Sequence, residues 1–368
     1  MSSCSNTGLG SNGELSATQR HRLAWQIGFF VVFTLAPLFD VLRFDLTQGH
    51  AYILGLPWRL GIDDFLAGHI GSGQAALNLL LRLFLPLLGG AAIFIAIAWR
   101  WGRLYCGWLC PHFSVVETIN QLMSRASGKP SIWERKTLPP RHADGSLRLT
   151  DARWWLLVVP MAVCFAFIWA VVFLTYLLPP IEIYSNLANL TPTRNQTIFL
   201  TAGTIVLTIE FLFARHLFCR YACAVGLFQS LAWMSNRGAM VVGFSRSRAA
   251  DCESCYVAQG PGDAACEAVC PMRLRPRTAK HKMFTCTQCG QCIAACNTVQ
   301  QVQGPQEGLL RWVADDAARQ NEATVSLTGV RDESTTAKAS AGGNKAQPRP
   351  RRHIPIVPLT TQRATNET

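Results

Sequence analysis

Long apolar stretches set the strongest limit on what this chain can fold into. Four of them precede residue 214, namely Leu23–Leu42, Leu83–Trp99, Trp154–Leu178 and Thr197–Phe213. Each is close to the ~17–25 residues that a helix needs to cross the core of a bilayer. Only 15% of the residues are charged, against roughly 25% in soluble domains. We therefore expect an α-helical integral membrane protein with about four transmembrane helices.

The distribution of basic residues predicts the orientation of these helices. Nine Lys and Arg residues lie in Arg100–Arg153, between the second and third apolar stretches, whereas the neighbouring connections carry few. Cytoplasmic loops are enriched in Lys and Arg. We expect a multi-pass protein of the bacterial inner membrane with both termini in the cytoplasm. The formal net charge of +12 then reflects contact with anionic membrane lipid.

Eight cysteines near the C-terminal side of the last apolar stretch are spaced as iron–sulfur ligands. One run is Cys286-x2-Cys289-x2-Cys292-x3-Cys296, and another comprises Cys252, Cys255, Cys266 and Cys270 before Pro271. In two-cluster ferredoxins the fourth cysteine of each run serves the other cluster. The spacing therefore predicts two [4Fe–4S] clusters. Their ligands would be Cys252, Cys255, Cys266 and Cys296 for one, and Cys286, Cys289, Cys292 and Cys270 for the other.

Zinc is the alternative occupant of such cysteines. Structural zinc sites usually pair two short Cys-x2–4-Cys knuckles, without a third cysteine so close. The spacing therefore favours clusters, and a reducing cytoplasm would keep the thiols free to bind them. One departure is the spacer Tyr256–Ala265, which we expect to form a loop and which weakens the assignment of Cys266.

A duplicated motif follows the second and fourth apolar stretches. Arg103-Leu-Tyr-Cys106-Gly-Trp-Leu-Cys110 and His216-Leu-Phe-Cys219-Arg-Tyr-Ala-Cys223 share one pattern. In a helix, cysteines four positions apart lie on one face. We expect Cys106, Cys110, Cys219 and Cys223 to converge at the inner membrane surface. Four thiolates suit Cu(I) or a further iron–sulfur centre, whereas buried cysteines can also simply pack as small apolar residues.

Three other polar residues lie close to this motif. His112 and His216 flank the two cysteine pairs, and we expect both to be solvated at the interface rather than to act as ligands or proton donors. Glu210 near the end of the fourth stretch is either a proton-handling residue or a solvated one. Cys164 lies alone in the third stretch, where we expect it to pack.

These features divide the chain into four parts. We expect a disordered cytoplasmic leader at 1–22, a membrane domain at 23–244, a small α+β two-cluster ferredoxin-like module at 245–304, and a disordered tail at 305–368. The tail is rich in Ala, Ser, Thr, Asn, Gln and Pro, which cannot bury a core. Within it, Leu309–Val313 could form a brief amphipathic turn.

Several function classes lack support in the sequence. There is no Cys-x-x-Cys-His haem motif, and no phosphate-binding or dinucleotide-binding glycine motif follows a strand. The basic balance is not accompanied by a basic helix or an aromatic stacking platform, so nucleic-acid binding is not expected.

The order of motifs resembles the membrane polyferredoxins. Within these, Leu42-Arg43-Phe-Asp, Leu104-Tyr-Cys106-Gly-Trp-Leu-Cys110-Pro111, and Cys219-Arg-Tyr-Ala-Cys223 with Phe228-Gln-Ser are similar to the CcoG/FixG-type cytochrome oxidase accessory proteins. The resemblance implies an oxidoreductase that reduces Cu(II) to Cu(I) during assembly of a haem–copper oxidase. Ala224 stands where that family has proline. The related NapH/NosR-type proteins imply the alternative, a quinol-linked electron conduit that feeds a reductase.

We therefore predict a membrane iron–sulfur electron-transfer protein. In the copper hypothesis Cys106, Cys110, Cys219 and Cys223 bind copper and are the catalytic residues. The expected partners are a cytoplasmic electron donor, membrane lipid, and a copper chaperone, copper ATPase or oxidase subunits. The conduit hypothesis replaces the copper partners with quinone, and a non-catalytic assembly scaffold or redox sensor is the third alternative.

Overall fold

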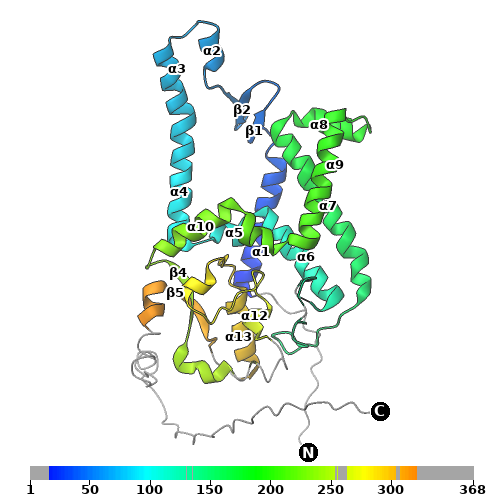
Figure 1. The fold of residues 1–368 in the computed structure, drawn as a ribbon, viewed down its shortest axis with the longest axis vertical. Helices are drawn as coiled ribbons and strands as arrows, with labels where there is room; N and C mark the ends of the chain where they lie inside the picture. Colours follow the sequence, from blue (N-terminus) through cyan, green and yellow to red (C-terminus); the bar gives the residue numbers. More distant parts are fainter. Residues whose placement is uncertain are drawn as a thin grey trace, which may run out of the picture.

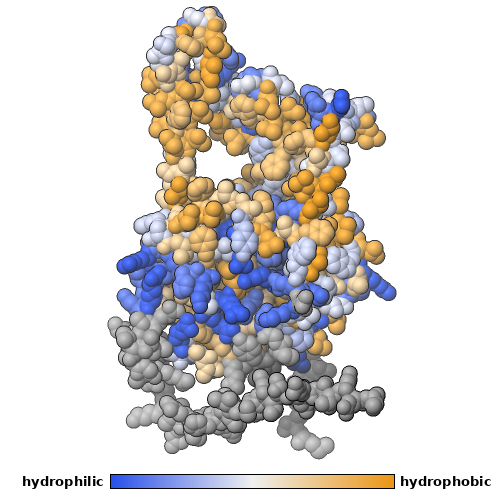
Figure 2. Space-filling model, viewed as in Figure 1, coloured by the Kyte–Doolittle hydropathy of each residue, from blue (hydrophilic) through white to orange (hydrophobic). Residues whose placement is uncertain are grey.

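The computed structural model describes residues 16–320, except 130, 135, 253–254, 256–262 and 304–306. Most of the predicted leader, spacer loop and tail lies outside these residues. Long helices form the upper part of the molecule and a compact cysteine-rich module forms the lower part (Figure 1). Figure 2 shows hydrophobic side chains over the helical part and a hydrophilic belt below it. This division is the one expected of a protein with one part in a bilayer and one in water.

Within the described residues, three helices are long and apolar enough to cross a membrane: Ser72–Trp101, Ala152–Leu177 and Arg194–Ala214. The first consists of α3 (Ser72–Leu79), the π-helical turn η1 (Leu80–Phe84) and α4 (Leu85–Trp101). The second consists of the 3-10 turn η2 (Ala152–Trp154) and α7 (Trp155–Leu177). The third consists of α9 (Arg194–Ile209) and the π-helical turn η3 (Glu210–Ala214). α7 packs against α9, and a Cβ on Gly203 would lie 3.3 Å from that of Ala170. Small residues permit such close helix packing.

The first predicted span differs most from the structure. Its helix, α1, covers Ala17–Leu35, and Leu42 already begins a strand. α1 is not among the three helices apolar enough to qualify as a span, so the count of four is not supported. The predicted leader is wrong for residues 17–22, which form the first turns of α1. α1 begins earlier and is less apolar than predicted because its first turns carry Gln19, Arg22 and Gln26. These polar side chains are buried against other parts of the protein.

A small cap covers the end of the helices opposite the module (Figure 1). It contains the antiparallel strands β1 (Leu42–Asp45), β2 (His50–Ile53) and β3 (Leu56–Trp58) and the short helices α2 (Ile62–Leu66) and α8 (Pro180–Ala188). Asp45 is fully buried and pairs with Arg43 at 2.8 Å. The amide of Leu46 donates to the carbonyl of Leu177, which ties the cap to α7.

Two further helices lie between the long helices and the module. α6 (Pro111–Ser127) buries Val116, Ile119 and Met123 against α7, and α10 (Ala224–Ser235) packs on α4. α6 has an apolar face toward α7 and a polar face elsewhere, as expected for a helix at the edge of a core. Each begins directly after a cysteine of the duplicated motif, so these helices position the candidate site.

The module extends beyond its predicted limits of 245–304. It contains β4 (Met240–Phe244), η5 (Arg246–Cys252), α12 (Ala265–Ala268), η6 (Lys280–Met283), α13 (Gln291–Gln303) and β5 (Leu310–Ala314). β4 pairs antiparallel with β5, from Met240 opposite Ala314 to Phe244 opposite Leu310. The predicted amphipathic turn at Leu309–Val313 is therefore a strand, and the tail assignment is wrong from residue 307 to 320. Pairing with β4, 66 to 74 residues earlier in the chain, orders this segment.

Candidate functional site

The eight module cysteines lie around two separate cavities. One has about 340 Å³ of empty volume and is lined by Cys270, Cys286, Cys289 and Cys292; we call these the inner group. The other has about 330 Å³ and is lined by Cys252, Cys255, Cys266 and Cys296; we call these the outer group. The structure thus brings together the same two sets that the crosswise rule assigns. Ligation of clusters by each set remains a prediction.

The surroundings of these thiols fit iron–sulfur clusters. The backbone amides of Ala265, Leu274 and Leu309 donate to the sulfurs of Cys255, Cys270 and Cys296 at 3.3–3.4 Å. Hydrogen bonds to sulfur are one of the means by which proteins tune cluster potentials.

Burial raises the pKa of Cys270 to about 11 and that of Cys266 to about 12. Thiols with such pKa values carry protons at neutral pH when no metal is bound. Binding of iron would therefore release protons, and affinity should weaken as the pH falls.

Among the residues that the structure describes, no three His, Cys, Asp or Glu side chains lie close enough together to hold a single metal ion.

Each copy of the duplicated motif forms a unit in which a short helical turn ends and a new helix begins, rather than one continuous helix. Cys106 lies in α5 (Leu104–Trp108) and Cys219 in the π-helical turn η4 (Phe218–Ala222). The second cysteine of each pair lies beyond that turn: Cys110 is the N-cap of α6 and Cys223 that of α10. The positive end of a helix dipole stabilises a thiolate there. Ala224 occupies the first position of α10, as Pro111 does in α6, so the missing proline leaves the geometry of the turn intact.

These four cysteines, which we call the interfacial quartet, lie close to one another. Burial raises the pKa of Cys110 to about 12, and the neighbouring thiols of Cys106 and Cys223 add to this rise. Burial likewise raises the pKa of Cys219, with Cys110 and Cys106 adding to it. Cys110 and Cys219, one from each pair, also pack in the same apolar cluster, as the predicted convergence requires. What the quartet binds stays a prediction.

Both flanking histidines are less exposed than expected. Nε2 of His112 lies 2.9 Å from Oε2 of Glu210, and its Nδ1 lies 3.8 Å from Sγ of Cys219. His216 is 6% exposed. Burial, together with Arg273, Arg215 and Arg220, lowers the pKa of His216 to about 4. The expectation of solvated interfacial histidines is wrong, because the module covers this end of the membrane helices.

The binding loop of the inner group docks on the first cysteine motif. Oε1 of Gln288 accepts from the amide of Arg103 at 2.9 Å, and its carbonyl accepts from Nε1 of Trp108 at 3.0 Å. A Cβ on Gly107 would lie 2.1 Å from the carbonyl oxygen of Thr287. Beside this contact, Cys110 and Cys219 pack in one apolar cluster with Cys270 and Cys286. The inner group and the quartet therefore share one apolar cluster, which also contains Phe113, Met272 and Leu274.

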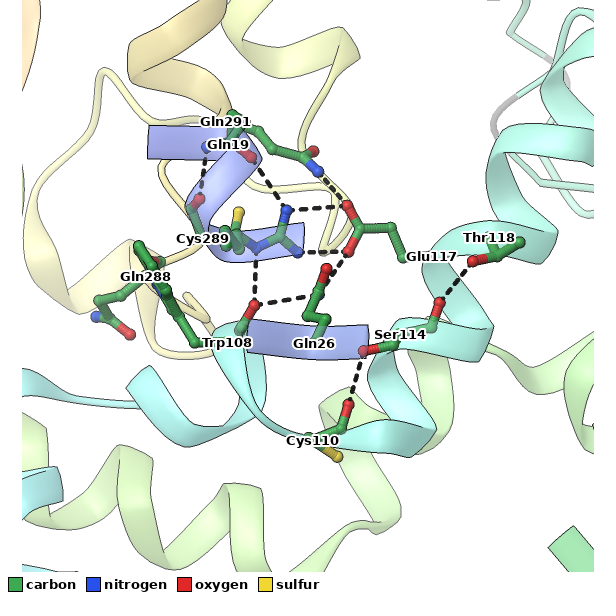
Figure 3. A network of polar contacts seen from close by, with 12 residues as sticks. Gln19, Gln26, Trp108, Cys110, Ser114, Glu117, Thr118, Gln288, Cys289 and Gln291 are labelled. Atoms are coloured by element: carbon green, nitrogen blue, oxygen red, sulfur yellow. Dashed lines mark hydrogen bonds and ion pairs between the residues drawn. The ribbon is translucent and has the colours of Figure 1, made fainter. Parts of the chain in front are cut away.

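A buried polar network joins α1 to the same contact (Figure 3). The Arg22 guanidinium makes two hydrogen bonds to Glu117 and donates through Nε to the carbonyl of Gly107 at 2.8 Å. Nε2 of Gln19 donates to the carbonyl of Cys289 at 3.0 Å, and Gln291 bonds Glu117. The ion pair of Arg22 and Glu117 and the hydrogen bonds around it thus connect α1, α6, the first cysteine motif and the loop that carries Cys289 of the inner group.

The sequence interpretation missed the residues of this contact. Arg22 and Gln19 fall in the predicted leader, and Arg103 appears in the sequence only as a basic loop residue and as the first residue of the duplicated motif. The spacing of Gln19, Arg22 and Gln26 is a usable signal, because it places three polar side chains on one face of a helix. For Arg103 the signal is its position in the duplicated motif, and no comparable signal marks Gln288.

Comparison with known proteins supports iron–sulfur binding. A family model described as "4Fe-4S binding domain" matches residues 83–130 and 195–238. These segments contain the interfacial quartet and exclude the module cysteines. No solved structure matches this chain.

Two curated proteins are similar to the chain. One is "Putative electron transport protein YccM" of Escherichia coli K12, which is 24% identical over 234 aligned residues; the alignment covers 63% of this chain and 57% of that protein. The other is "Uncharacterized protein MJ0750" of Methanocaldococcus jannaschii, which is 22% identical over 214 aligned residues; the alignment covers 57% of this chain and 75% of that protein. The chain therefore spans little more than half of the length of the E. coli protein.

Proposed function

We propose that this protein transfers electrons between its cytoplasmic module and the interfacial quartet at the membrane surface. The observation that carries the proposal is that Cys270 and Cys286 of the inner group share one apolar cluster with Cys110 and Cys219 of the quartet. Electron transport is also the activity named for the E. coli relative. Iron–sulfur clusters in the two module cavities would supply one-electron redox chemistry.

The three cysteine groups follow one another through the molecule. α13 carries Cys292 of the inner group and Cys296 of the outer group, so one helix joins the two cavities. The inner group then shares an apolar cluster with Cys110 and Cys219 of the quartet, which follows α4 and α9 in the chain. This order supports entry of electrons at the outer group, from a cytoplasmic donor, and their exit at the quartet.

An iron–sulfur centre is the better-supported occupant of the quartet. The matched 4Fe-4S family segments contain all four of its cysteines, and the described side chains are not grouped for a single ion. Copper bound by the same thiolates, with Cu(II) reduction for oxidase assembly, is the alternative that the family resemblance implies. Soft thiolates would stabilise Cu(I), but no contact in the structure favours copper.

A quinol-linked conduit is the second candidate function. The observation in its favour is the pair of His112 and Glu210, which lies at the membrane end of the quartet and contacts Cys219 through His112. Within the described residues, Oε1 of Glu210 is buried without a hydrogen-bond partner. Oxidation of a quinol would require groups that accept protons near the electron acceptor, and this pair would meet that need.

Iron analysis of cysteine variants tests the proposal. In anaerobically purified protein we expect about eight iron atoms per chain from the module, and about four more if the quartet holds a [4Fe–4S] cluster. The double variant Cys106→Ser/Cys219→Ser should lose only the additional iron. Cys164→Ser is the matched control, because Cys164 lies exposed in the middle of α7.

The same variants separate the alternatives. Copper bound at the quartet, with Cu(II) reduction lost in the double variant, would favour the copper hypothesis. Reduction by a soluble quinol that is lost in Glu210→Gln would favour the conduit. If the double variant kept wild-type iron content and wild-type activity in both assays, the quartet cysteines would be packing residues and the proposal would be wrong.

A further inference from the structure

Arg103 is buried between the quartet and the inner group. Its side chain is 1% exposed, and it lies directly after Gly102, whose φ is +70°. One terminal nitrogen donates to the carbonyl of Cys219 at 2.8 Å, and the backbone amide of Arg103 donates to Gln288. Within the described residues, its Nε has no hydrogen-bond partner. The chain therefore holds a guanidinium in a fixed place between two groups of cysteines.

The charge of Arg103 lacks a carboxylate partner. The buried arginines Arg22 and Arg43 pair with Glu117 and Asp45. The fully buried Arg215 instead bonds three neutral side chains, those of Asn120, Met123 and Ser131, whereas the Arg103 side chain bonds one backbone carbonyl. In the part of the chain that the structure describes, no Asp or Glu forms an ion pair with Arg103. An unpaired buried charge is expensive, and such charges are normally paired or neutralised. A side chain kept in this position therefore calls for a negative partner of another kind.

Thiolate sulfurs are the anions within reach. The Arg103 side chain bonds the backbone of Cys219, and Cys106 lies three positions after Arg103 in the chain. Gln288, which bonds the Arg103 amide, lies between Cys286 and Cys289. Cys106 and Cys219 belong to the quartet, and Cys286 belongs to the inner group. A thiol bound to metal is deprotonated outright. Redox centres on both groups would therefore give Arg103 the negative partners that its surroundings otherwise lack.

We propose that Arg103 is the shared counter-charge of the inner group and the quartet, a positioning residue that raises the reduction potentials of the centres they hold. The inference rests on the proposed function for the presence of those centres. Each added electron increases the negative charge of a centre, so a nearby fixed cation stabilises the reduced state. Gln288 and Cys219, which bind Arg103 from the two sides, hold it where it acts on both.

The outer group differs in its local charge. Arg277 lines the cavity of the outer group together with Cys252, Cys255 and Cys266. It is paired with Glu267 at 2.8 Å, and Glu267 is the residue directly after Cys266. The positive charge at the outer group is therefore compensated by a carboxylate, whereas that of Arg103 is not. This contrast makes the inner centre the easier one to reduce and directs electrons toward the membrane.

Redox titration of the full-length protein, followed by electron paramagnetic resonance, tests this role. In Arg103→Gln we expect the ratio of reduced to oxidised inner centre at a fixed potential to fall at least tenfold, which is a 59 mV downward shift for one electron. The outer centre, identified as the signal lost in Cys252→Ser, should keep its potential. Arg100→Gln is the matched control, since Arg100 is exposed and its side chain donates to the carbonyl of Gly238.

A second variant keeps the test decisive if Arg103→Gln fails to bind iron. A Cβ on Gly226 would lie 2.1 Å from a terminal nitrogen of Arg103, so Gly226→Ala displaces the guanidinium without changing any charge. We expect a downward shift of the inner potential in this variant, and little shift in Arg103→Lys. The measurement is made on whichever of the variants Arg103→Gln and Gly226→Ala binds iron. If the reduction potential of the inner centre in that variant equalled the wild-type value, the inference would be wrong. A quartet that holds neither iron nor copper would instead count against the proposed function, because the inner centre still reports on Arg103.

Discussion

Two buried arginines hold their charges in different ways at the contact between module and membrane helices. Arg22 is paired with Glu117 and bonds the carbonyl of Gly107, so it acts as a structural connection. Arg103 forms no ion pair with a carboxylate among the described residues and donates to the backbone carbonyl of Cys219. Both side chains lie within the same contact, yet only removal of Arg22 leaves a carboxylate buried without its partner.

At this scale we predict the stability of Arg22→Ala. Removing one partner of a buried ion pair costs about 3–5 kcal/mol, because the other charge remains buried. The free energy of unfolding in detergent should fall by that amount. Arg20→Ala is the control: Arg20 is exposed on the same helix, and its loss should change stability by no more than about 0.5 kcal/mol. Equal stability of the two variants would show that the network does not support the fold.

At the scale of elements, the duplicated motif positions its cysteines by ending one helix and beginning another. Cys110 and Cys223 are both N-caps with extended backbone, at ψ values of 114° and 107°. The first cysteine of each pair lies in a preceding turn, α-helical in one unit and π-helical in the other. π-helical turns frequently mark functional sites. The two units are therefore similar in construction but not identical.

The contact between the first unit and the inner loop predicts the effect of Gly107→Ala. The new Cβ would meet the backbone carbonyl of Thr287 at 2.1 Å, and neither backbone can yield easily. We expect amide hydrogen exchange in residues 104–109 and 285–290 to rise at least tenfold, while the outer group keeps its iron. Gly89→Ala is the control, because nothing lies within 4 Å of its Cβ position. Unchanged amide hydrogen exchange in Gly107→Ala would mean that these two segments are not in close contact.

At the scale of the whole molecule, α1 decides the number of membrane crossings. Its 19 residues span about 28 Å at 1.5 Å per residue. Its first turns bond the inner loop through Gln19, whereas Phe33 near its end accepts from the hydroxyl of Tyr176 near the end of α7. α1 therefore runs beside α7 from the module to the cap, although its polar residues lower its hydropathy.

We accordingly predict that α1 crosses the membrane. A topology reporter fused before residue 16 or after Arg153 should behave as cytoplasmic, and one inserted between residues 45 and 74 as periplasmic. This result follows from the nine Lys and Arg residues of Arg100–Arg153. If reporters before and after α1 lay on the same side, α1 would not span the bilayer and the positive-inside assignment of the N-terminus would be wrong.

Local pattern was enough to predict much of this protein from its sequence. Hydropathy placed Trp154–Leu178 and Thr197–Phe213 within one to three residues of helices Ala152–Leu177 and Arg194–Ala214. Cysteine spacing grouped Cys252 with Cys296 and Cys270 with Cys286, as the two cavities do. These features depend on residues near one another in sequence, or on a ligand-sharing rule tied to spacing.

Tertiary structure alone decided the limits of the module and the polar contacts at the quartet. β5 belongs to the module because it pairs with β4, which lies 66 to 74 residues earlier in the chain. Arg22 can be buried because its partner Glu117 lies on another helix, α6. Arg103 lies between two cysteine groups only because the Gln288 loop folds back onto it. A charged residue has no fixed role in a sequence, since burial and the charge of distant neighbours determine whether it is solvated, paired or placed beside a redox centre.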